Sequence, residues 1–184
     1  MNHRSSLRDN QNIFSLMVVG YPYLVRTTLG LSSAHYGVAE SAAGVAAILG
    51  SVAAGFMSAH GAAWMRRMLG MSGVAVLVAG VGFALGLGAE FVVLVAAFSL
   101  ANMACSAFSV CAMTAIQRRT PESMTGKVMA FVYTLSLCAQ PLGQLLYGAL
   151  FDALPPAWVL IPSGAVVAAA AIVLRGFFAQ LDLP

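Results

Sequence analysis

Charged residues are scarce in this sequence: nine Lys and Arg and six Asp and Glu make up only 8% of its 184 residues. A soluble domain carries about 25% charged residues, so this chain could not cover a surface that faces water. Hydrophobic residues supply 60% of the chain, and its mean hydropathy is +0.89. Despite a pI near 9.0, these values exclude a nucleic-acid-binding protein and a soluble enzyme. They predict an integral membrane protein in contact with a lipid bilayer.

Cysteine is also rare, with Cys105, Cys111 and Cys138 placed inside apolar stretches. Their number is odd and their spacing does not match a metal site, so we expect free thiols that behave as small apolar side chains. No H-E-x-x-H motif, phosphate-binding loop or dinucleotide glycine pattern is present. The sequence therefore predicts no metal, no cofactor and no enzymatic activity.

One enzymatic alternative stays open at this point. Residues 70–73 read GMSG, which resembles the G-x-S-G of rhomboid-type serine proteases. The serine of such a protease needs a histidine base on a later helix, but His3, His35 and His60 all precede Ser72. A small Gly-Ser-Gly step in helix packing is the favoured interpretation.

Long runs without charge predict six membrane-spanning helices, since about 20 apolar residues cross a bilayer core. The first is short and follows Arg4 and Arg8, so a signal peptide is its alternative. The expected organisation is a cytoplasmic segment at 1–12, a six-helix transmembrane domain at 13–175 and a cytoplasmic tail at 176–184. The predicted spans are 13–31, 36–58, 68–88, 91–113, 128–151 and 156–175.

The distribution of Lys and Arg predicts the orientation, because cytoplasmic loops are enriched in both. With the N-terminus inside, only Arg26 lies outside. Both termini are therefore expected in the cytoplasm, with the protein in the cell membrane. The basic residues then on the cytoplasmic side are Arg4, Arg8, Arg66, Arg67, Arg118, Arg119, Lys127 and Arg175.

The fifth span carries the clearest polar face. Gln140, Gln144 and Tyr147 fall within about 40° of Tyr133 on a helix with 100° per residue, so the four share an arc of about 60°. Such a face either lines a substrate path or makes hydrogen bonds to neighbouring helices, and the sequence does not choose between these readings. Pro141 removes a backbone hydrogen bond in this span and predicts a kink.

The second and fourth spans also carry polar residues, whereas most of the third and sixth spans does not. The fourth carries Asn102, Ser106 and Ser109 on one arc, for which packing is favoured, and the second carries Glu40, a possible titrating group. Residues 73–89 and 164–174 have no polar side chain, which is typical of lipid-facing helices. Bare helices at the third and sixth places suggest two three-helix repeats around a cavity.

Several segments resemble a known family. Residues 117–129 read QRRTPESMTGKVM, followed by QPLG at 140–143 and GALFD at 148–152. This resembles the loop between the tenth and eleventh helices of drug-efflux-like permeases of the major facilitator superfamily, with the eleventh helix after it. YPYLV at 21–25, LGLS at 29–32 and YG at 36–37 resemble the end of the seventh helix and the start of the eighth. The resemblance covers residues 12–175.

The resemblance implies the C-terminal six-helix half of a twelve-helix fold in which the third helix of each repeat lies outside. It also places a cytoplasmic G-x-x-x-D-x-x-G-R-R signature near residues 55–67, although here the acidic residue is missing and the spacing is stretched. It implies loop or gating roles for residues on the cytoplasmic side, namely Arg66, Arg67, Arg118, Arg119, Gly126 and Lys127.

The expected function is a secondary active transporter module that exports a small molecule, such as a drug, by alternating access. We expect Tyr133, Gln140, Gln144 and Tyr147 to line the substrate path, with Asn102 and Ser106 opposite. A second six-helix half, from the same gene, a split partner or a second copy, is the expected protein partner. The alternative is a non-transporting membrane subunit or a truncated remnant of a permease.

Overall fold

The computed structural model describes residues 16, 18–57, 61–86 and 90–173, and every element in these ranges is helical. The first helix is described from residue 18 and widens into a π-helix, η1 (Tyr23–Thr28). Gly30, with a φ of +62°, allows the chain to turn after it, in a conformation that favours glycine. The helices that follow are α2 (Ser33–Met57), α3 (Gly61–Leu85), α4 (Glu90–Arg119), α5 (Glu122–Ala153) and α6 (Pro156–Val173).

Five of the six predicted spans are confirmed as continuous helices that are long and apolar enough to cross a membrane. Most of the first predicted span, 13–31, is helical as far as Thr28, but residues 13–15 and 17 lie outside the described part. The segments predicted at 1–12 and 176–184 also lie outside it. Helix α5 continues through Pro141, and the kink expected there stays a prediction.

The cytoplasmic loop predicted before the fifth span is much shorter in the structure than expected. Helix α4 runs on to Arg119 and α5 begins at Glu122, so only Thr120 and Pro121 separate them. Lys, Arg and Glu favour helix, so the helices continue beyond the apolar segments instead of ending where the charges begin. Gly126 and Lys127 therefore lie in a helix and not in a loop.

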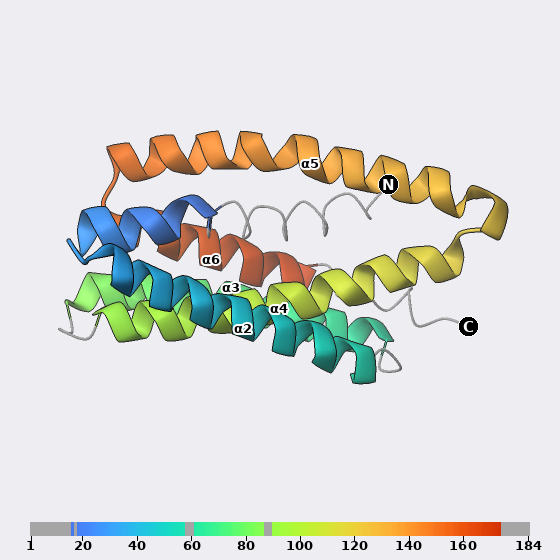
Figure 1. The fold of residues 1–184 in the computed structure, drawn as a ribbon, viewed down its shortest axis with the longest axis horizontal. Helices are drawn as coiled ribbons and strands as arrows, with labels where there is room; N and C mark the ends of the chain where they lie inside the picture. The colour runs from blue at the N-terminus through green and yellow to red at the C-terminus, as the bar shows by residue number, and fades with distance from the viewer. Residues whose placement is uncertain (1–15, 17, 58–60, 87–89, 174–184) are drawn as a thin grey trace.

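The long helices pack in a chain of pairs, and α5 stands apart from them. Helix α2 packs against α4, α4 against α3, and α3 against α6, whereas α5 has few contacts, with α6. Figure 1 shows α5 running along one side of the bundle, separate from α2, α3 and α4. Of the α5 side chains, only Phe151 is buried. The most polar span is therefore the least enclosed of the five.

The two helices that contain the stretches without polar side chains, α3 and α6, are pressed against each other. A Cβ built on Gly73 of α3 would lie 2.6 Å from the backbone nitrogen of Ala168, and one on Gly164 of α6 would lie 2.6 Å from that of Leu77. The expectation of lipid-facing helices holds for the opposite faces only, where Val74 of α3 is exposed. Glycines let helix backbones approach closely. The apolar stretches of α3 and α6, which the sequence assigned to lipid contact, therefore form an interface between the two helices.

The first helix is attached to the bundle through Tyr21. Its buried hydroxyl donates a hydrogen bond to the carbonyl oxygen of Ala39 in α2 at 3.1 Å, and its ring stacks on Phe98 of α4 with centroids 4.9 Å apart. A tyrosine that faces neighbouring helices can bury its ring and, at the same time, form a hydrogen bond with its hydroxyl. This contact fixes the helix that forms one wall of the outer cleft described below.

Candidate functional site

Most of the polar face of α5 is turned toward the rest of the bundle, although Tyr133 is exposed, and the leucines on the other side of the helix are turned away. Gln140, Gln144 and Tyr147 are partly buried, whereas Leu142 and Leu145, on the other side, are 69% and 72% exposed. A soluble helix would have the reverse arrangement. The outer leucines suit hydrocarbon, and the inner amides suit polar neighbours or water.

A cleft of about 520 Å³ lies between α4 and α5 and brings two of the predicted residues together. We call it the inner cleft because the orientation predicted from the sequence puts it nearer the cytoplasm. Tyr133 and Gln140 line it from α5. The lining residues also include hydroxyl, amide and apolar side chains, namely Ser109, Val110, Met113, Thr114, Gln117, Ser136 and Leu137.

The inner cleft contains residues that sequence reasoning missed. Gln117 was assigned to a loop, but it lies in the last turns of α4, eight residues after Ser109 and four after Met113. This helical spacing is visible in the sequence. It would have placed Gln117 on the same face as Ser109 and Met113 if the predicted fourth helix had been continued to residue 117. Thr114 also lines this cleft, and its hydroxyl donates a hydrogen bond to the Val110 carbonyl oxygen at 2.9 Å.

The remaining predicted lining residues lie elsewhere. Asn102 donates a hydrogen bond from Nδ2 to the Ala43 carbonyl oxygen of α2 at 3.0 Å, which agrees with the packing interpretation, and its role in lining a substrate path stays a prediction. Ser106 is partly buried in α4, one turn from Asn102, and is not among the residues of the cleft. Gln144 lies beyond the inner cleft on α5, and Tyr147 packs against the core.

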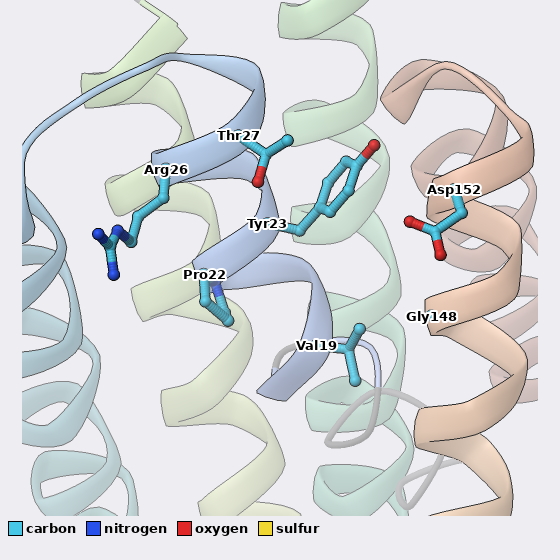
Figure 2. A pocket seen from close by; sticks show the side chains of 7 residues that line it. All are labelled: Val19, Pro22, Tyr23, Arg26, Thr27, Gly148 and Asp152. Carbon is cyan, nitrogen blue, oxygen red and sulfur yellow. The ribbon is translucent and has the colours of Figure 1, made fainter.

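A second cleft of about 600 Å³ opens at the other end of α5, where η1 faces it. Figure 2 shows its side chains, with Tyr23 between the two walls. We call it the outer cleft, and it is lined by Val19, Pro22, Tyr23, Arg26, Thr27, Gly148 and Asp152. From the sequence, Tyr23 and Asp152 were noted only within segments that resemble the family, and Arg26 only as the one basic residue expected outside.

The polar face of α5 joins the two clefts. Tyr133 and Gln140 belong to the inner cleft, Gly148 and Asp152 to the outer one, and Gln144 lies between them. The 19 residue steps from Tyr133 to Asp152 span about 28 Å of helix. This is close to the thickness of a bilayer core, about 30 Å. One helix therefore contributes residues to both clefts along nearly the whole crossing.

Glu40 is exposed on α2, two turns into the helix. It lies close enough to the Tyr36 hydroxyl for a side-chain hydrogen bond, and the Tyr36 ring meets Tyr21 edge-on with centroids 6.5 Å apart. The carboxylate belongs to neither cleft. Its predicted role as a titrating group stays a prediction.

Five of the basic residues assigned to the cytoplasmic side lie in the described part of the chain, at one end of the bundle, whereas Arg4, Arg8 and Arg175 lie outside it. Arg66 and Arg67 lie in the first turns of α3, Arg118 and Arg119 end α4, and Lys127 lies near the start of α5. All but Arg66, which is partly buried, are exposed. This clustering agrees with the topology expected from the sequence.

Ser72 and the cysteines take part in helix packing. The buried Ser72 hydroxyl donates a hydrogen bond to the Leu69 carbonyl oxygen at 2.8 Å, within its own helix. Cys105 and Cys111 are buried, Cys138 is exposed, and none of the three forms a disulfide. Among the described residues, no group of three or more His, Cys, Asp or Glu side chains is placed to hold a metal ion.

The sequence as a whole matches the family model of the Major Facilitator Superfamily over residues 10–182. The chain belongs to the major facilitator superfamily. This family consists of transporters, and the all-helical, membrane-spanning structure agrees with membership. No curated protein and no solved structure matches the chain. In this major facilitator protein, the α5 face with its two clefts is the strongest candidate for the functional site.

Proposed function

We propose that this chain is a module of a secondary active transporter that exports an amphipathic small molecule, with the polar face of α5 lining the path. The observation that carries the proposal is the direction of that face. Gln140 lies beside the inner cleft, and Leu142 and Leu145 are exposed on the other side of the helix. Family membership supports transport, and a scaffold would need no such face.

The composition of the inner cleft supports an amphipathic substrate. Ser109, Ser136 and Gln140 offer hydroxyl and amide groups, and Met113 and Leu137 offer apolar surface. A few placed polar groups in an otherwise apolar pocket are typical of small-molecule sites. No charged side chain lines this cleft among the described residues, so its contribution to binding is shape and hydrogen bonding. Glu40 is the proposed site for coupling to protons.

The exposed position of α5 supports a second six-helix half. A polar helix with one buried side chain would be stabilised by a partner that closes the cleft, in the manner expected of a cavity between two halves. An immunoblot of native membranes with an antibody against residues 115–127 tests how that half is supplied. A band near twice 19.0 kDa means one gene supplies both halves, and a band at 19.0 kDa means a separate partner or a second copy.

Export itself is tested in the protein's own cells after deletion of its gene. We expect deleted cells to accumulate at least one fluorescent amphipathic compound severalfold above the parent, because outward transport is lost. Re-expression should restore export, and an uncoupler should abolish it. Equal accumulation of a broad set of compounds in deleted and parental cells, with the protein present in parental membranes, contradicts the proposal.

A further inference from the structure

We propose that the outer cleft is a binding site for an organic cation, a small molecule with a quaternary or protonated amine, held by the Asp152 carboxylate and the Tyr23 side chain. This site is separate from the inner cleft and lies at the opposite end of α5. Equilibrium binding there does not require transport, so the proposal stands independently of the proposed function.

The backbone of the first helix forms one wall of the outer cleft. η1 is a π-helix of six residues that starts directly after Pro22. Such wide turns are rare, and they occur often at functional sites. Here the widened turns place Tyr23, Arg26 and Thr27 along one side of the space.

The opposite wall is held in place but left open at one position. Phe151 of α5 is buried and stacks on the Tyr23 ring with centroids 5.3 Å apart, which fixes the two walls together. Gly148, one turn earlier, has no side chain, and a Cβ built there would meet nothing within 4 Å. The space beside Gly148 is therefore free for a ligand.

The charges of the outer cleft favour a cation. Figure 2 shows the Asp152 carboxylate pointing toward Tyr23, and the Arg26 guanidinium on the far side of Pro22, pointing away from Asp152. Among the described residues, neither of these two charged side chains makes an ion pair. A carboxylate at the edge of a low-dielectric bundle attracts a cation more strongly than one in bulk water.

Tyr23 and the apolar residues complement that charge. The face of an aromatic ring attracts a cation placed over it, so the Tyr23 ring adds cation–π attraction to the charge of Asp152. Val19 and Pro22 give apolar surface for the substituents of the amine. The volume of about 600 Å³ lies within the range of small-molecule pockets.

The test uses the purified full chain in lipid nanodiscs. Isothermal titration calorimetry measures the equilibrium binding of benzyltrimethylammonium. Ligand-observed NMR measures the binding of neopentylbenzene, which has the same shape without the charge. We expect the cation to bind and the isostere to bind at least tenfold more weakly. Asp152→Asn should weaken cation binding at least tenfold. Glu122→Gln is the matched control, because it removes the same charge from the other end of α5 and should leave binding unchanged.

Gly148→Leu tests the position of the ligand. The new side chain should fill the cleft and abolish binding, whereas Gly126→Leu, also at an open position on α5, should not. A folded wild-type chain that does not bind the cation, or an Asp152→Asn variant that binds it equally well, overturns the proposal. Cation binding without any export would contradict only the proposed function, and export without cation binding only this inference.

Discussion

Cells that carry Gln140→Leu and Gln144→Leu in the same chain are expected to lose export by about ten- to a hundredfold. Each amide offers the substrate hydrogen bonds worth about 0.5–1.5 kcal/mol net. Two of them correspond to one or two factors of ten, since about 1.4 kcal/mol changes an equilibrium constant tenfold. Efflux of the compound identified in deleted cells gives the measurement.

Membrane insertion should not suffer, because leucine is more favourable than glutamine in a span. Leu142→Ala with Leu146→Ala is the control on the lipid-facing side of the same helix, where both leucines are exposed. That pair should retain most of the export. If the glutamine double variant exported normally at equal protein levels, the α5 face would not line the substrate path.

Gly164→Leu is expected to prevent stable packing of α3 and α6. A Cβ at Gly164 would lie 2.6 Å from the Leu77 nitrogen and 2.7 Å from the Gly73 oxygen, so backbone atoms of α3 would have to move. Overpacking costs about 1–3 kcal/mol, and more where backbone must shift. For a chain of this size about 3 kcal/mol lowers Tm by roughly 10 °C. Thermal unfolding of tagged protein in mild detergent, followed by size-exclusion chromatography, measures the shift.

Ala165→Leu is the matched control for that variant. It adds a larger side chain one residue away on α6, at an exposed position. Its Tm should stay within a few degrees of the wild type. Equal stability of the Gly164→Leu and Ala165→Leu chains would mean that α3 and α6 do not approach as closely as the structure has them.

The spans could be predicted because hydrocarbon imposes a simple requirement on the sequence. A helix that crosses it needs about 20 apolar residues, and the scarce charges of this chain mark the ends of such runs. The inward direction of Gln140 and Gln144 was also predictable, since 100° per residue fixes which side chains share a face. Neither inference needs knowledge of which helices are neighbours.

Contacts between helices could not be predicted in the same way. Asn102 and Gln140 look alike in the sequence, but one bonds to α2 and the other lines the inner cleft. Helix ends were also misplaced, because α4 continues to Arg119 and α5 begins at Glu122, both beyond the apolar runs that predicted the spans. The outer cleft joins Tyr23 to Asp152, and residues so far apart in the sequence carry no periodic signal.

The most direct test of the central claim is the water accessibility of the two faces of α5. In a chain with Cys105, Cys111 and Cys138 replaced by serine or alanine, single variants Ser136→Cys and Leu142→Cys are treated with a water-soluble maleimide in native membranes. Ser136 lines the inner cleft and Leu142 faces outward. Only a thiol in contact with water ionises and reacts readily. We predict rapid labelling at residue 136, little at residue 142, and equal labelling of both after denaturation. Rapid labelling at residue 142 with none at residue 136 would contradict the claim that the polar face of α5 lines an aqueous path.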